Sequence, residues 1–126
     1  MKKTFAAVAI ICTVFAAGVA VGQQATSRRE PQFENSEVQV WKSIISPGKP
    51  LGLHRHEHGR ALVSLNGGVL NVVDGNGKVI DVYKLEAGKA MWLDADKPGT
   101  QHADVNPGKT DVEVVVVQLK NDKPKM

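Results

Sequence analysis

The stretch LGLHRHEHGRALVSLNGG, residues 51–68, holds three of the four histidines in this chain of 126 residues. On a β-strand, side chains two residues apart lie on the same face, so His54 and His56 would project together. Two imidazoles placed in this way can hold one divalent ion. A third ligand must come from elsewhere in the chain, and the remaining histidine outside this stretch is His102.

Outward from this stretch, short β-branched runs alternate with Gly, Pro, Asn and Asp. Such spacing without a helical period predicts an all-β sandwich or barrel. The turn Asp74-Gly75-Asn76-Gly77 predicts a tight hairpin, because Gly and Asn accept the positive φ that hairpin turns require. The last run is apolar on both faces except at Glu113, which predicts a central strand with this charge reaching solvent. The expected strands are 38–45, 51–56, 61–65, 69–73, 79–83, 90–93, 101–105 and 111–119.

The N-terminus has the layout of a secretory signal peptide. Lys2 and Lys3 precede an uncharged apolar run, and small residues follow at Ala20 and Gly22. We expect cleavage after Gly22 or Ala20, which predicts a periplasmic or secreted domain without stable membrane insertion; the alternative is an uncleaved membrane anchor. The expected organisation is a signal peptide at 1–22, a polar linker or N-terminal arm at 23–37, a barrel domain at 38–120 and a C-terminal tail at 121–126.

Cleavage changes the charge of the chain. Two lysines leave, so 16 basic residues become 14 against 13 acidic ones, and the net charge falls from +3 to +1. Without a basic run this argues against nucleic acid as a partner. The single cysteine, Cys12, leaves with the signal, so stability must come from a hydrophobic core, for which about 100 residues suffice.

The histidine spacing resembles the first motif of the cupin superfamily, which runs Gly, five residues, His-x-His, three residues, Glu, six residues, Gly. One position differs, because an arginine stands where the family has glutamate. The matching positions are Gly48, His54, His56, Arg60 and Gly67.

The second cupin motif runs Gly, five residues, Pro-x-Gly, two residues, His, three residues, Asn. Gly88, His102 and Asn106 match its ends. Its middle departs from the family, since Asp94-x-Asp96 stands for Pro-x-Gly and about three extra residues lengthen the turn. We expect Asn106 to shape the turn that follows it.

The resemblance implies a cupin-type antiparallel jelly-roll barrel, also called a double-stranded β-helix, with a pocket in its mouth. It places His54, His56 and His102 at the three cupin histidine positions, where a divalent ion such as iron, zinc, manganese, nickel or copper would bind. Small cupins often pair through their N-terminal segment, so a homodimer is a further outcome that the resemblance allows.

Arg60 changes the local charge by two units relative to glutamate and cannot ligate a metal. Three interpretations stay open: a metal on three neutral imidazoles with Arg60 binding a substrate carboxylate or phosphate, a metal-free anion pocket, or a shell completed by Glu57 or His58. Arg60 and His58 are the candidate substrate-binding residues. The structural alternatives are a salt bridge from Arg60 to Glu57, Asp94 or Asp96, and a rim position for His58.

The function classes also stay open. Iron on three histidines resembles the thiol dioxygenase branch of the cupins, where an arginine binds the substrate carboxylate, and a Lewis-acidic metal would serve isomerisation or elimination. A non-catalytic periplasmic protein that binds a small molecule or metal would have the same barrel residues, and a structural envelope protein would need neither. Tyr83 is a candidate proton donor, with a rim position as its alternative, and no residue is a convincing general base.

Overall fold

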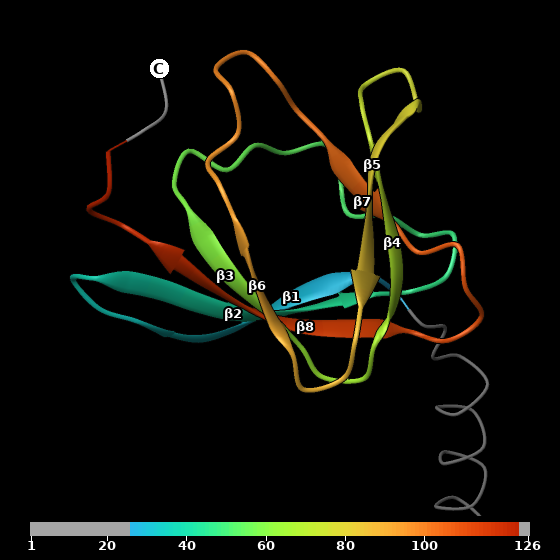
Figure 1. The fold of residues 1–126 in the computed structure, drawn as a ribbon, viewed down its shortest axis with the longest axis horizontal. Helices are drawn as coiled ribbons and strands as arrows, with labels where there is room; N and C mark the ends of the chain where they lie inside the picture. Colours follow the sequence, from blue (N-terminus) through green and yellow to red (C-terminus); the bar gives the residue numbers. More distant parts are fainter. Residues whose placement is uncertain (1–25, 124–126) are drawn as a thin grey trace, which may run out of the picture.

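A computed structural model describes residues 26–123, which form strands and loops (Figure 1). The expected signal peptide at 1–22 lies outside the described residues. Within residues 26–123 there is no helix with the length and apolarity that a membrane crossing requires. The strands are β1 (Arg28–Glu34), β2 (Val38–Ile45), β3 (Arg60–Ser64), β4 (Gly68–Val73), β5 (Val79–Leu85), β6 (Ala90–Leu93), β7 (Ala103–Val105) and β8 (Val112–Leu119).

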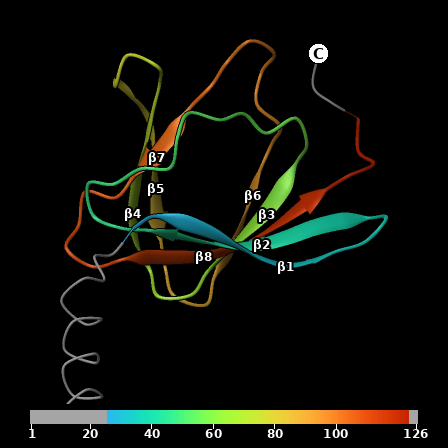
Figure 2. The same cartoon turned by 180° about the vertical axis from the view of Figure 1, so that it is seen from behind.

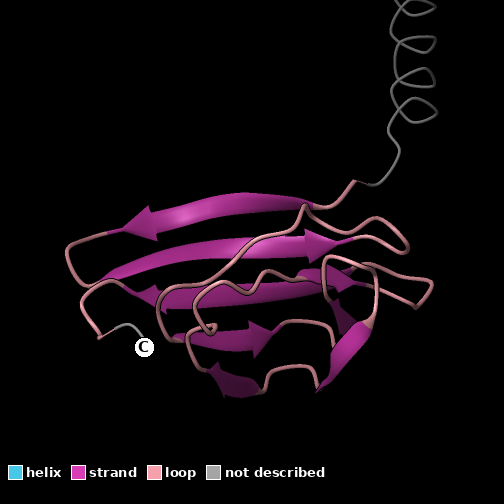
Figure 3. Ribbon diagram, turned by 90° about the horizontal axis from the view of Figure 1, so that it is seen from above, coloured by secondary structure: helices cyan, strands magenta, loops and turns pink. Residues whose placement is uncertain are grey.

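Two antiparallel sheets make up the described part of the chain. The larger has the order β1-β2-β8-β3-β6 and the smaller the order β5-β4-β7. Figures 1 and 2 show the smaller sheet standing at one side of the larger one, and Figure 3 shows the larger sheet's strands lying side by side. The chain crosses repeatedly between the sheets, so residues far apart in sequence meet in the space between them.

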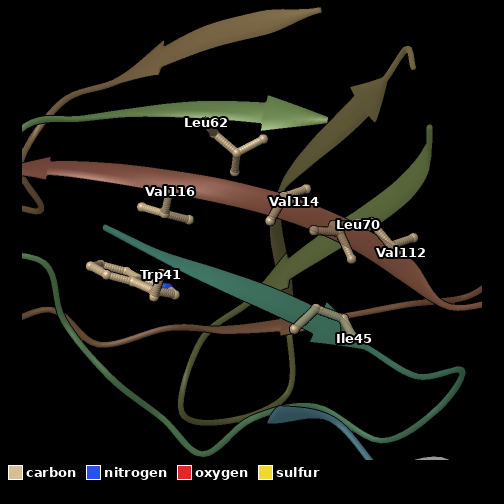
Figure 4. Close-up of a cluster of buried hydrophobic side chains, with 7 residues drawn as sticks. All are labelled: Trp41, Ile45, Leu62, Leu70, Val112, Val114 and Val116. Carbon is tan, nitrogen blue, oxygen red and sulfur yellow. The ribbon is translucent and has the colours of Figure 1, made fainter. Parts of the chain in front are cut away.

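The core forms where β8 lies between β2 and β3. Alternate residues of β8 are buried, because successive side chains of a strand point to opposite faces. The predicted central position of this strand is confirmed. The side chain of Glu113 is 37% exposed and lies 3.6 Å from Lys42 of β2. Figure 4 shows the buried cluster, which consists of Trp41, Ile45, Leu62, Leu70, Val112, Val114 and Val116.

The hairpin predicted at residues 74–77 joins β4 to β5. The Asp74 N–H donates to the Lys78 carbonyl at 2.9 Å, and the Asp74 carboxylate accepts from the backbone N–H groups of Asn76 and Lys78. Only Gly77 has a positive φ, of 81°, so within the turn glycine is required at that position. The hydrogen bonds to the Asp74 carboxylate therefore stabilise this turn as much as the conformational freedom of Gly77 does.

Asn106 shapes its turn as expected and also ties that turn to β2. Its side-chain amide donates to the carbonyls of Ile45 at 2.8 Å and Thr110 at 2.7 Å, while its oxygen accepts from the Gly108 N–H at 2.8 Å. The residue is only 2% exposed. A buried amide with three partners fixes the approach from β7 into β8.

The interpretation of residues 23–37 as a linker or loose arm is wrong for Arg28–Glu34, which form β1. This strand pairs with β2 along its length and has a register shift between Pro31 and Phe33. It is the edge of the sheet and mostly exposed, so it carries no alternating apolar pattern, and an edge tolerates proline. Pairing with a second copy through this segment stays a prediction.

Candidate metal centre

The two histidines of the first motif lie on the connection between β2 and β3, residues 46–59. The strand expected at 51–56 is wrong, because one isolated bridge forms there, in which His54 and His102 exchange backbone hydrogen bonds of 2.9 Å. Prolines and glycines in this connection interrupt regular pairing. Figures 1 and 2 show the connection running past β7 to the start of β3. The bridge brings the histidine of the second motif beside the pair of the first.

The three predicted histidines form one cluster. The ring centroids of His54 and His56 are 5.0 Å apart, those of His54 and His102 are 4.6 Å apart, and those of His56 and His102 are 5.6 Å apart. One ligand atom from each residue lies within 4.8 Å of the others. His56 and His102 are 7% and 6% exposed. These three histidines are therefore able to hold one metal ion.

Each of these rings has an oxygen beside its Nδ1 atom. For His54 it is the Gly52 carbonyl at 2.8 Å, for His56 the Gln118 Oε1 at 2.9 Å, and for His102 the Asp96 Oδ2 at 3.3 Å. Since these oxygens can only accept, a neutral ring carries its proton on Nδ1. The lone pair is then on Nε2, and this second hydrogen bond is the usual device that orients a metal-binding histidine.

The Nε2 atoms of His54 and His102 are buried and have no hydrogen-bond partner among the described residues. Burial, followed by the nearby Arg60 guanidinium, lowers the pKa of His56 to about 3. Burial also lowers the pKa of His102. Neutral rings with buried, unpartnered Nε2 atoms are what a divalent ion requires of its ligands, so the residues fit a metal.

Arg60 begins β3 and is 4% exposed. Its Nη1 donates to the backbone carbonyl of Asp94 at 3.3 Å. Burial lowers its pKa, while Asp96, Tyr83 and Asp104 raise it. The arginine that stands at the glutamate position of the motif is thus buried beside the histidine cluster.

Glu57 and His58 are not brought to the cluster. The side chain of Glu57 is 67% exposed and lies 3.3 Å from Arg55. His58 Nδ1 lies 2.6 Å from the Asp122 carboxylate, which also accepts from the Gly59 N–H at 2.8 Å. The interpretation in which one of them completes the metal shell therefore has no support in the geometry, and His58 as a substrate-binding residue stays a prediction.

Two residues that sequence reasoning missed orient the histidines. The Asp96 carboxylate accepts from the His56 backbone N–H at 2.7 Å and lies beside His102. Gln118 on β8 accepts from His56. The sequence marks Asp96 only as a departure from the second motif and as a possible partner of Arg60, and Gln118 gives no signal, because a single glutamine near a strand end is ordinary.

Two further charged residues face the same space. Asp104 Oδ2 lies 3.8 Å from His54 Nε2. Arg29, from the unexpected strand β1, lies over the Trp41 ring at 5.0 Å, and burial lowers its pKa. Asp104 was predictable, since it follows His102 by two residues on a strand, whereas Arg29 lay in a segment without periodicity.

A small cavity of about 30 Å³ lies between the sheets beside the histidines. This volume holds on the order of one or two water molecules or an ion. A wider hollow of about 490 Å³ shares Tyr83 with this cavity and offers room for a small molecule. The polar residues that line the cavity are Arg29, Ser43, His54, His56, Arg60, Tyr83 and Asp104. Among the residues that line the hollow are Asp81, Tyr83, Asp96, Lys97, Thr100, Gln101 and His102.

Solved structures share this arrangement of strands. A cupin domain from Bordetella pertussis Tohama I superposes with a TM-score of 0.65 at 24% identity, over 78% of this chain and 97% of that one. An RmlC-like cupin family protein from Methanocaldococcus jannaschii superposes with a TM-score of 0.57 at 15% identity, over 78% of this chain and 84% of that one. The chain has the cupin fold. An uncharacterized protein with a double-stranded β-helix domain from Klebsiella pneumoniae gives a TM-score of 0.56 at 24% identity, over 77% and 79% of the two chains.

The cupin fold confirms the all-β, double-stranded β-helix class expected from the two motifs. Identities of 24% and below support the fold and not a shared activity. No protein-family model matches the sequence, and no curated protein matches it. The chemistry of this chain must therefore be inferred from its own residues.

Proposed function

We propose that this chain is an exported cupin that binds a divalent metal through His54, His56 and His102 and an anionic small molecule through Arg60. One observation carries the metal part. All three rings have an oxygen acceptor at Nδ1, while the buried Nε2 atoms of His54 and His102 have no hydrogen-bond partner within residues 26–123. Most buried polar side-chain atoms in folded proteins have a hydrogen-bond partner, so two unpartnered nitrogens in one histidine cluster favour a ligand between them.

The charges around the cavity support an anionic ligand. Arg29 and Arg60 bring two positive charges, and Asp96 and Asp104 bring two negative ones. The two arginines and two aspartates cancel in charge, so a divalent ion bound to neutral imidazoles would give the site a net charge of about +2. Arg60 carries five N–H donors in a fixed fork, which suits a carboxylate or phosphate. We therefore propose a small carboxylate or phosphate compound as the ligand.

A metal bound here would supply Lewis acidity, and iron would in addition supply redox chemistry. The protein's own contribution is to orient the ligand and to donate hydrogen bonds. Burial raises the pKa of Tyr83 to about 12. This hydroxyl would thus stay protonated near neutral pH and act as a donor toward the ligand and not as a base. Oxygen uptake by the iron-loaded protein distinguishes a dioxygenase from a binding protein.

Export is proposed from residues 1–22, which combine two lysines, an apolar run and small residues at the expected cleavage point. The mass of the protein recovered from its native compartment tests this. A mass that begins at Val21 or Gln23 supports a cleaved signal, and an intact N-terminus contradicts it.

Metal content per chain is the decisive measurement for the proposed site. We expect near-stoichiometric metal in the native protein and none in the His54→Ala/His56→Ala double variant. His58→Ala is the matched control, because this histidine lies on the same connection but pairs with Asp122, and it should keep its metal. If the native protein stays empty after exposure to iron, zinc, copper, nickel and manganese, the proposal is wrong.

A further inference from the structure

We propose that the Asp104 carboxylate is a fourth ligand of the metal, supplied by β7 in place of the glutamate whose position Arg60 occupies. The inference rests on the proposed metal site and goes beyond its three histidines. It assigns a ligand to a position that the cupin motifs do not mark.

The position of Asp104 favours a role as a metal ligand. It follows His102 by two residues, so both side chains project to the same face, and both Asp104 and His54 line the cavity between the sheets. Its Oδ2 lies 3.8 Å from His54 Nε2. Its Oδ1 is buried and has no hydrogen-bond partner among the described residues. A buried carboxylate oxygen without a partner is costly unless a cation or donor completes it.

Two electron-rich atoms, one from His54 and one from Asp104, face each other here. His54 donates through Nδ1 to the Gly52 carbonyl, so its Nε2 presents a lone pair. That lone pair faces a carboxylate oxygen across 3.8 Å. A charge-assisted hydrogen bond between the two would be about 2.7–2.9 Å long, so no shared proton explains the contact. A cation bound by both atoms would complete the coordination of each.

Asp96 provides the contrast. Its Oδ2 accepts from the His56 backbone N–H at 2.7 Å and lies 3.3 Å from His102 Nδ1. This oxygen is thus engaged on the far side of the rings from Nε2, in a positioning role. Of the two aspartates that lie beside the histidines, Asp104 is the one that faces a ligand nitrogen.

A competing explanation is that Asp104 only neutralises the two arginines, since its charge acts on both Arg29 and Arg60. The two explanations differ in whether Asp104 coordinates the metal directly. A ligand changes the visible spectrum of bound cobalt(II), which depends on the number and type of coordinating atoms. A charge that acts through space changes the affinity and leaves the spectrum as it was.

Cobalt(II) titration of the purified protein and of Asp104→Ala tests the inference, with affinity measured by competition against a chromophoric chelator. We expect affinity to fall by more than about 100-fold, beyond the roughly 10–100-fold that loss of an outer partner costs. The cobalt spectrum should change, and added formate should restore it by returning a carboxylate. Glu37→Ala is the matched control, since it removes an exposed carboxylate from the turn before β2.

The outcomes separate the two proposals. If the wild type binds cobalt and Asp104→Ala keeps the same spectrum, at whatever affinity, the fourth ligand is wrong and the three-histidine site stands. If the wild type binds no cobalt, the metal site itself is wrong. Circular dichroism and thermal unfolding of each variant exclude loss of the fold as the cause.

Discussion

The core around β8 and the metal centre are held in different ways. In the core, Val112, Val114 and Val116 are placed by the alternation of β8, which pairs with β2 along its length and with β3 from Val114 to Gln118. In the metal centre, His54 and His56 lie on a connection that forms isolated bridges and no strand, and hydrogen bonds from their rings to nearby oxygens set their orientation.

Because the two regions are held differently, substitutions in the core should affect mainly stability, and substitutions around the metal centre should affect mainly metal affinity. Core side chains stabilise by burial, so their loss should lower the free energy of unfolding and leave the metal ligands in place. Side chains that orient the histidines contribute less burial but determine which nitrogen faces the metal. Their loss should lower metal affinity with a smaller effect on unfolding.

Leu70→Ala should give the largest effect, a decrease in the free energy of unfolding. Leu70 is 2% exposed and belongs to the buried cluster. Removing a buried leucine side chain costs about 3 kcal/mol, within the roughly 2–5 kcal/mol seen for such changes. Chemical denaturation measures this loss, and the metal content of the folded fraction should stay unchanged. A Leu70→Ala protein that folds normally but loses its metal would break the separation of the two regions.

The same comparison explains what the sequence could predict. The strand 38–45 was predicted with its observed bounds, and β8 within one residue, because long apolar runs with alternation signal buried strands. The motif spacing correctly predicted that the three histidines lie together, even though the strand expected at 51–56 is wrong. The prediction of the cluster does not require a strand at 51–56, because the single bridge at His54 is enough to bring His102 beside it.

The partners of the histidines were beyond sequence reasoning. Gln118 meets His56 across 62 residues, and Asp96 meets its backbone across 40 residues. Such contacts depend on how the connection between β2 and β3 packs against β8 and the loop after β6, which local patterns do not specify. Arg29 was missed for a different reason, since an exposed edge strand has no apolar side from which to be recognised.

Arg60→Gln should give the second-largest effect, a loss of affinity for an anionic ligand. Arg60 stands where the two regions join, at the first residue of β3 and beside the cavity. Loss of a charged hydrogen-bond donor should weaken binding of acetate or inorganic phosphate to the metal-loaded protein by about 10–100-fold, equivalent to roughly 1.5–3 kcal/mol. Isothermal titration calorimetry measures this.

Arg28→Gln is the control for this prediction, because Arg28 pairs with Glu30 on the exposed edge strand β1, away from the cavity. It should bind both anions as the wild type does. Arg60→Lys keeps the charge but loses the fork, and intermediate affinity is expected. Equal affinities in wild type, Arg60→Lys and Arg60→Gln would contradict a role for Arg60 as the anion anchor.

Gln118→Ala should give the smallest effect and the sharpest test of how the centre is held. The variant removes the acceptor at His56 Nδ1, so the ring is free to change its protonated nitrogen and its orientation. Metal affinity should fall by about tenfold, the lower end of outer-partner losses. Without metal, the free energy of unfolding should fall by about 1 kcal/mol, the cost of one lost hydrogen bond.

Gln39→Ala is the matched control, because Gln39 lies opposite Gln118 on β2 and is exposed. It should change neither quantity. If Gln118→Ala lowers stability by as much as Leu70→Ala, then His56 is held as part of the core and the two regions are one. If metal affinity falls while stability stays within about 1 kcal/mol of the wild type, side-chain hydrogen bonds orient the metal ligands and strand packing supports only the fold.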